Sequence, residues 1–358
     1  MFSTDKRWKH LGSLLVNYSA EVRPGERVMI AMTELESFPL VHAVYEAVVK
    51  VGAYPQVQFL SETLRHLLIK YGTIELLDWV PEIEAYGMDW GDVYFGLRGA
   101  HNLHEQWDVA ADRLSRNQAT MGRVSTLRWE KTRWCLVRVP NSDFAQQAGT
   151  DLETSIDMFF DSCLIDWRTE SAKWSAWTET LSKSSVVRIV GKNTDLSFSV
   201  EGRKWSVAGG KLNMPDGEIS TAPLTETVDG QIFFENPGVL GGRLMHDLTL
   251  RWEHGQLVHA HASTNQEYLQ SIVNHDAGAG LIGEFALGTN LGVTRFSNDI
   301  LMDEKINGTV HIALGRAYTE HGGTNKSAIH WDIVKDIRKE GAVYIDNRCI
   351  LQHGDYLF

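Results

Sequence analysis

Cysteine is scarce in this chain of 358 residues. The three cysteines, Cys135, Cys163 and Cys349, are widely separated, and none belongs to a Cys-x-x-Cys pair. This spacing argues against a disulfide framework and against a zinc site made of thiolates. The simplest expectation is therefore a protein of a reducing compartment, the cytoplasm.

Long hydrophobic runs, excess positive charge and nucleotide-binding motifs are missing as well. No stretch approaches the roughly 20 apolar residues that cross a bilayer, and no signal peptide is visible. The formal net charge is -12, whereas a nucleic-acid binder normally carries a basic stripe. Neither Gly-x-Gly-x-x-Gly nor a P-loop occurs, so the sequence does not indicate a nucleotide cofactor. We therefore expect no nucleic-acid partner and no membrane partner.

The N-terminal half alternates apolar runs of strand length with stretches of helical periodicity. Strands are expected at 28–32, 57–60, 93–97 and 134–139, and helices at 8–20, 38–51, 67–84 and 102–118. Strands that alternate with helices in this order favour a parallel sheet. The sequence thus predicts an α/β domain with a parallel sheet over residues 1–180.

The C-terminal half has a different texture, in which short strand-like runs are separated by Gly, Asp and Asn turns. Such runs lie at 186–190, 196–200, 231–234, 248–252, 257–260, 310–314 and 342–345. A turn at His254-Gly255 joins two of them into an expected hairpin, and 268–273 is the one helix expected between them. We therefore predict an α+β domain over residues 181–358, with a mostly antiparallel sheet.

A His-x-Asp pair, His330 and Asp332, lies in an apolar stretch of this second half. In an extended strand, residues two apart point to the same side. An imidazole nitrogen and a carboxylate oxygen would then converge, which is half of a metal site. The pair alone also fits an aspartate that fixes the tautomer of a structural histidine.

Three further polar side chains stand in apolar or glycine-flanked segments of the same half. Glu218 follows the turn Pro215-Asp216-Gly217, Glu284 lies in an apolar run after Gly283, and His311 lies in an apolar strand. Each alone also fits an ordinary structural role. A buried carboxylate must, however, be paired or bound to a metal.

Together the two histidines and three carboxylates form a set of five nitrogen and oxygen ligands, which suits Zn, Co or Mn. Two metals at a shared site can hold a bridging water and polarise a carbonyl, which hydrolyses an amide without a covalent intermediate. Tyr318, seven residues after His311, is a candidate donor to the oxyanion. A packing role for this tyrosine stays open.

At these residues the chain resembles the aminopeptidase T family of metallopeptidases, also called M29. The resemblance covers nearly the whole length and is most specific in the C-terminal half. The segments that carry it are Val22–Val28, Met214–Glu218, Thr221–Pro223, Gly283–Asn290, His311–Tyr318 and His330–Asp332.

The resemblance implies a two-metal aminopeptidase whose ligands are Glu218, Glu284, His311, His330 and Asp332, with Glu284 as the bridging carboxylate. Tyr318 would match the active-site tyrosine of the family. The α-amine of the substrate would need an acceptor near the metals, such as Glu218, Glu284 or a backbone carbonyl. Members of the family form homodimers with an enclosed internal space, so short peptides are the expected substrates.

Three alternatives stay open. One is an amidase that acts on a non-peptide substrate. Another is a dihydroxypyridine ring-cleaving dioxygenase, which shares the architecture and binds one Fe(II) through two His and one Asp; His311, His330 and Asp332 would suffice for it. A mononuclear iron site has no use for Glu218 and Glu284, so these two favour the peptidase. The third alternative is a non-enzymatic protein that binds a metal or a small molecule.

Overall fold

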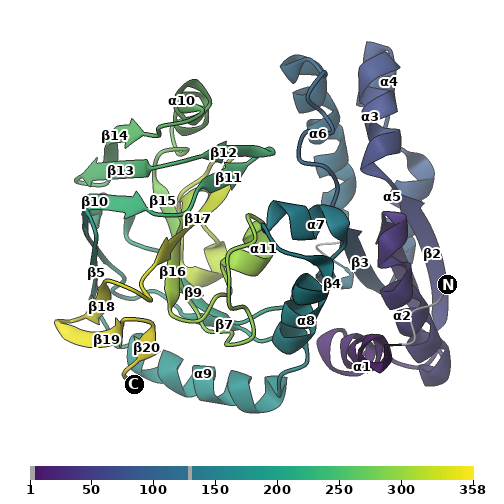
Figure 1. Ribbon diagram of the computed structural model, residues 1–358, viewed down its shortest axis with the longest axis horizontal. Helices are drawn as coiled ribbons and strands as arrows, with labels where there is room; N and C mark the ends of the chain where they lie inside the picture. Colours follow the sequence, from purple (N-terminus) through teal and green to yellow (C-terminus); the bar gives the residue numbers. More distant parts are fainter. Residues whose placement is uncertain (1–4, 128–130) are drawn as a thin grey trace. The chain divides into compact units, whose positions relative to one another are not determined.

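The computed structural model describes residues 5–127 and 131–358. The chain forms two compact units (Figure 1). The first contains the residues up to Leu164 together with Gly210–Pro215, and the second contains Ile165–Gly209 and Asp216–Phe358. The division between the units therefore lies at residue 164, where the sequence had suggested 180, and the chain returns once to the first unit.

The first unit is built on a five-stranded sheet in the order β2-β1-β3-β4-β8, and all its neighbouring strands are parallel. The sheet confirms the predicted α/β class. Its strands are β1 (Arg27–Thr33), β2 (Tyr54–Leu60), β3 (Val93–Gly99), β4 (Arg133–Val139) and the short β8 (Asn213–Met214). Between β1 and β2 runs α2 (Phe38–Val51), which ends at Gly52 because glycine tolerates the φ of 83° found there.

Two helix predictions in this unit are wrong. The stretch 67–84 is not one helix, because Gly72 ends α3 and Pro81 directly precedes α5. The stretch 102–118 begins with turns, in which the Asn102 side chain accepts a hydrogen bond from the backbone N–H of His104. The helices are α1 (Lys6–Leu14), which continues as a π-helical turn (Leu15–Ser19), α3 (Glu62–Tyr71), α4 (Ile74–Asp78), α5 (Glu82–Trp90), α6 (Ala111–Thr126), α7 (Ser142–Gln147) and α8 (Leu152–Cys163).

The second unit contains an antiparallel sheet of eight strands in the order β14-β13-β10-β6-β5-β18-β19-β20. The expected hairpin is present, since His254 and Gly255, both with positive φ, join β13 to β14. The strands are β5 (Val186–Gly191), β6 (Thr194–Ser199), β10 (Asp229–Phe234), β13 (Leu248–Glu253), β14 (Gln256–His261), β18 (Ala342–Ile345), β19 (Arg348–Gln352) and β20 (Asp355–Tyr356).

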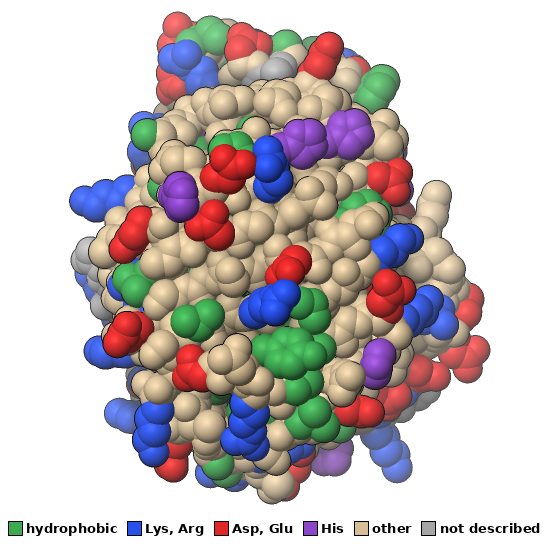
Figure 2. Space-filling model, turned by 90° about the vertical axis from the view of Figure 1, so that its left-hand side faces the viewer, with side chains coloured by type: hydrophobic (Ala, Val, Ile, Leu, Met, Phe, Trp, Pro, Cys, Tyr) green, Lys and Arg blue, Asp and Glu red, His purple; other side chains and the backbone are tan. Residues whose placement is uncertain are grey.

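The outer surface of this unit carries lysine, arginine, aspartate and glutamate side chains interspersed with one another on the face drawn in Figure 2. No broad region of positive charge is visible on that face, in keeping with the net charge of -12. Among the described residues, no helix is long and apolar enough to span a membrane.

A second antiparallel sheet of this unit, in the order β17-β16-β15-β9-β7, carries the candidate ligands. The rings of Phe198 and Trp205 pack on Phe285 of this sheet, with centroids 5.2 and 6.1 Å away. Its strands are β7 (Ser206–Ala208), β9 (Glu218–Thr221), β15 (Ile282–Gly288), β16 (Thr309–Gly315) and β17 (His330–Asp336). The unit also contains α9 (Trp167–Leu181), α10 (Gln266–Val273), α11 (Ile300–Asp303), β11 (Gly238–Leu240) and β12 (Arg243–Met245).

Candidate metal centre

Strand register places the candidate ligands on one face of the five-stranded sheet. Glu284 and Asp332 both lie opposite Ala313, one on each side of β16. His311, two residues before Ala313, points to the same side because side chains alternate along a strand. His330 pairs with Gly315 and Glu218 pairs with Gly288. The positions between the ligands are thus alanine or glycine, so no large side chain separates the ligands.

The first group of ligands, the His330 cluster, consists of Glu284, His330 and Asp332, with one ligand atom from each within 4.8 Å of the others. The His330 Nε2 atom lies 3.4 Å from Glu284 Oε2 and 3.5 Å from Asp332 Oδ2. The Nδ1 atom lies 2.8 Å from the carbonyl oxygen of Arg316. A carbonyl can only accept, so Nδ1 carries a proton and donates it. In neutral His330 the Nε2 lone pair therefore faces two carboxylates.

That arrangement requires a positive charge between the three side chains. Burial alone would lower the pKa of His330, but Asp332 and Glu284 outweigh this effect and raise the pKa to about 9. A proton on Nε2 meets the requirement in the metal-free protein. A metal ion coordinated by Nε2 would meet it equally, and a hydrogen bond from Nδ1 to a carbonyl is the usual support of a ligating histidine.

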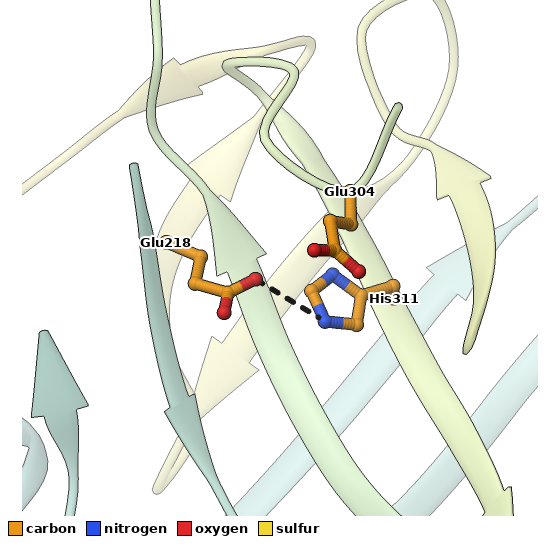
Figure 3. A group of neighbouring side chains, drawn as sticks. All are labelled: Glu218, Glu304 and His311. Carbon is orange, nitrogen blue, oxygen red and sulfur yellow. Dashed lines mark ion pairs between the residues drawn. The ribbon is translucent and has the colours of Figure 1, made fainter. Parts of the chain in front are cut away.

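The second group, the His311 cluster, consists of Glu218, Glu304 and His311, again with ligand atoms within 4.8 Å of one another. Figure 3 shows the two carboxylates converging on the imidazole from different elements, and the His311 Nε2 atom lies 3.5 Å from Glu218 Oε2. His311 is only 1 % exposed, and its Nδ1 atom has no hydrogen-bond partner in the described part of the chain. A buried polar atom without a partner is costly, and a bound ion would offset part of that cost.

A buried lysine adjoins the His311 cluster. The Nζ atom of Lys305 lies 2.8 Å from Glu304, 2.9 Å from Glu218 and 3.5 Å from Asp216. Burial opposes the charge of Lys305, but these carboxylates outweigh it and raise the pKa of the ammonium. Burial likewise works against ionised Glu218, yet Lys305 and His311 lower its pKa. For Glu304, burial dominates and raises the pKa, and the negative charges of Glu218 and Asp332 add to the shift.

A loop around Asn290 fixes the backbone under the His311 cluster. The Asn290 side chain donates to the carbonyl of Asp216 at 2.7 Å, and its backbone N–H donates to the carbonyl of Lys305 at 2.9 Å. Between Asp216 and Glu218 stands Gly217, with a φ of 114°, where a Cβ atom would come within 2.9 Å of the Asn290 Cβ. Only glycine tolerates both constraints, so Gly217 sets the direction in which Glu218 leaves the turn.

Tyr318 lies next to the His330 cluster, with its ring centroid 4.9 Å from that of His330. Burial raises the pKa of the phenol, and the negative charges of Glu284, Asp332 and Glu304 raise it further. The phenol therefore stays protonated at neutral pH. It can donate a hydrogen bond to an oxygen that gains negative charge at this position.

Charge counting tests whether divalent ions fit the two clusters. Five carboxylates, those of Asp216, Glu218, Glu284, Glu304 and Asp332, face one ammonium, that of Lys305. When all five carboxylates are ionised and both histidines are neutral, as metal ligation requires, five minus one leaves four negative charges, which two divalent cations would balance. The donor atoms are all oxygen and nitrogen, as Zn, Co and Mn accept. The residues therefore fit two ions.

The structure brings all five residues proposed from the sequence into the two clusters and adds one that sequence reasoning missed. That residue is Glu304, whose neighbours Asp303 and Lys305 make it part of a charged run, and such a run is ordinarily a solvated turn. The histidines fall into different clusters, so among the described residues His311, His330 and Asp332 do not form one compact triad.

Known proteins resemble this chain over almost its whole length. A family model described as thermophilic metalloprotease (M29) matches residues 4–353. Aminopeptidase 2 of Geobacillus stearothermophilus is 24% identical over 410 residues, covering 99% of this chain and 98% of the relative. Aminopeptidase T of Thermus thermophilus is 28% identical over 243 residues, covering 56% of this chain and 59% of the relative.

Two solved structures share the fold. Wild-type AmpT from Thermus thermophilus superposes with a TM-score of 0.87 at 22% identity, over 99% of this chain and 100% of that one. A 2,5-dihydroxypyridine dioxygenase from Pseudomonas putida KT2440 superposes with a TM-score of 0.64 at 13% identity, over 98% and 96%. Since hydrolase and oxygenase share the scaffold, the assignment of chemistry depends on the site.

Proposed function

Because the chain belongs to the M29 family of metalloproteases, which makes it a peptide-bond hydrolase, we propose that it is an aminopeptidase with a dinuclear metal centre. The observation that carries the proposal is the pair of three-ligand clusters in which five of the six ligands lie on one face of a single sheet, while Glu304 follows α11. One ion would be held by Glu284, His330 and Asp332. The other would be held by Glu218, Glu304 and His311, and Glu284 is our candidate for the bridging ligand.

Two bound divalent ions, Zn, Co or Mn, would supply Lewis acidity for the scissile carbonyl and would lower the pKa of a water bridging them. The protein's own residues supply the rest. Tyr318 donates from its protonated phenol to the carbonyl oxygen as negative charge develops there. Its position beside the His330 ring, at a centroid distance of 4.9 Å, supports this role.

A free α-ammonium group is what distinguishes the substrate of an aminopeptidase, so the site needs an anionic acceptor. We assign this role to Glu218, whose side chain is 14% exposed against 6% for that of Glu284. Ala286, Ala313 and Gly315 lie between the ligands, so no large side chain separates them. The proposed substrates are short peptides.

The dioxygenase alternative is less well supported by the site. Its ligand set of two His and one Asp would need His311 beside His330 and Asp332, whereas His311 groups with Glu218 and Glu304. An amidase that acts on a non-peptide substrate would use the same centre, and only substrate tests separate it from a peptidase.

A panel of aminoacyl p-nitroanilides, assayed with Zn, Co or Mn added, tests the proposal. We expect release of nitroaniline from substrates with a free α-amine and none from their N-acetylated counterparts. Equal turnover of both sets would refute the aminopeptidase and favour a general amidase. Oxygen consumption with a hydroxypyridine, without amide hydrolysis, would favour the dioxygenase.

We also propose that the protein is a homodimer. Large apolar side chains are exposed on the short helices of the first unit: Leu64 (59%), Tyr71 (72%), Ile83 (86%) and Tyr86 (69%). Exposed apolar patches of this kind commonly mark protein contacts. Ile83→Asp should lower the mass measured by light scattering to that of one chain. An unchanged mass would place the contact elsewhere.

The proposed location is the cytoplasm. All three cysteines lie in the described part of the chain and form no disulfide. Thiols that remain unoxidised are the usual state in a reducing compartment.

A further inference from the structure

We propose that Lys305 makes the two metal positions unequal, so that the His330 cluster holds its ion more tightly than the His311 cluster holds the other. The inference rests on the dinuclear centre proposed above and assigns a function to a residue that is not itself a ligand. It identifies Lys305 as a positioning residue that sets metal affinity through its charge.

The ammonium group of Lys305 already occupies the oxygen atoms that a metal ion would need. The same Glu218 Oε2 atom lies 2.9 Å from Lys305 Nζ and 3.5 Å from His311 Nε2. Glu304 Oε1 lies 2.8 Å from the ammonium. Two of the three ligands of the His311 cluster are thus shared with a cation, which competes with a metal for the oxygens and repels its charge.

The ammonium cannot move aside into solvent. Lys305 is 0% exposed, and Asn290 holds the backbone at the Lys305 carbonyl and at the N–H of Asn307. The Asn290 N–H donates to the Lys305 carbonyl, and the Asn290 carbonyl accepts from Asn307 at 3.1 Å. A metal ion in the His311 cluster would therefore bind beside a fixed positive charge.

The His330 cluster has no such competitor. Among the described residues, no lysine or arginine lies within ion-pair distance of Glu284 or Asp332, whose ion pairs are with His330. An ion bound there displaces at most a proton from His330, whereas an ion at the His311 cluster remains next to Lys305. At the separations of a shared site, the repulsion should weaken the second ion by on the order of 100-fold.

The experiment begins with the full-length protein loaded with Zn. A chelator of known affinity is titrated in, and the metal retained per chain is measured by mass spectrometry after rapid desalting. We expect two release steps about 100-fold apart. In Lys305→Met the more weakly held ion should need a higher chelator concentration for its release, closer to that of the tightly held ion. Lys305→Arg keeps the charge, so its two release steps should stay separate.

Lys335→Met is the matched control, because Lys335 is another fully buried lysine of the same unit and is paired with Glu235. It lies opposite Val310 on β17, where alternation along the strand directs its side chain to the face of the sheet away from the ligands. The Lys335→Met variant should leave both release steps in place. If folded Lys305→Met releases its two ions in steps as far apart as those of the unaltered protein, the inference is wrong.

A pair of ligand variants tests the assignment even if Lys305→Met fails to fold. The tight step should persist in His311→Ala and disappear in His330→Ala. Loss of the tight step in His311→Ala instead would overturn the inference, as would a single release step of two ions from the unaltered protein. Two ions of equal affinity would leave the proposed dinuclear function intact, whereas binding of only one ion at saturating Zn would contradict both.

Discussion

The segment that leads into His330 is held by one carboxylate, and its removal makes a quantitative prediction. Asp276 Oδ2 accepts hydrogen bonds from the backbone N–H of Ala328 and the hydroxyl of Ser327, both at 2.9 Å. Its Oδ1 accepts from the backbone N–H of Gly278, also at 2.9 Å. Because β17 begins at His330, this clamp fixes the chain two residues before a ligand.

The magnitude follows from these three hydrogen bonds. Hydrogen bonds to a charged group contribute more than neutral ones, and Asn in place of Asp keeps one acceptor oxygen but loses the charge. For a partly exposed side chain we expect Asp276→Asn to lower the free energy of unfolding by about 1–2 kcal/mol at pH 7. The affinity of the His330 cluster for metal should fall about 10-fold, because a ligand held less rigidly must be ordered on binding.

Acidification should abolish the difference in stability between the unaltered protein and Asp276→Asn. The hydrogen bond from Ala328, followed by those from Ser327 and Gly278, lowers the pKa of Asp276 below its ordinary value of 3.8. A lowered pKa means that the ionised group stabilises the fold above the unfolded pKa, and that this stabilisation is lost as pH falls through the folded pKa. The difference between the two proteins should thus be full at pH 7 and should shrink below roughly pH 4.

Urea unfolding monitored by tryptophan fluorescence at several pH values measures the stability, and chelator competition measures the affinity. Asp346→Asn is the matched control, since Asp346 also accepts from backbone N–H groups, those of Ser185 and Val186. It directly follows β18 in the eight-stranded sheet, which carries none of the ligands. The Asp346→Asn variant should lose stability without losing metal. Equal metal loss in both variants, or a stability difference that persists in acid, would refute the reasoning.

Three further substitutions test other parts of the site. Glu284→Gln should lower activity at least 1000-fold without altering the circular dichroism spectrum, because it replaces a charged ligand; retained activity would show that Glu284 is not a ligand. Tyr318→Phe should lower kcat by about 100-fold at unchanged metal content, and an unchanged kcat would leave the tyrosine a packing residue. Asn290→Ala removes the donor to the Asp216 carbonyl and should destabilise the protein by about 2–3 kcal/mol in thermal unfolding; a neutral result would show that the loop is held by other contacts.

The features that could be predicted from the sequence are those determined by residues close to one another along the chain. Helix α2 was predicted with its observed bounds because its apolar periodicity runs up to a glycine that ends it. His311 and Glu284 attracted notice because a polar side chain within an apolar strand is expensive to bury. Their strands then brought them together through antiparallel pairing.

The features that sequence reasoning missed depend on contacts distant along the chain. Lys305 is buried because Asn290 and the Asp216 turn enclose it, and nothing within the run Asp303–Lys305 distinguishes it from a solvated turn. The return of the chain to the first unit depends on β8, two residues long, which no periodicity can reveal. Gly72 and Pro81 divide the stretch 67–84 into separate helices, and both residues are local signals of a helix boundary in the sequence.

The metal content of the protein as isolated tests the central claim most directly. Elemental analysis of protein purified without added metal should give close to two equivalents of Zn, Co or Mn per chain, because the site with its ligands deprotonated carries five carboxylates against the one ammonium of Lys305. His311→Ala and His330→Ala should each reduce the count toward one. A single equivalent of iron in the unaltered protein would contradict the dinuclear peptidase.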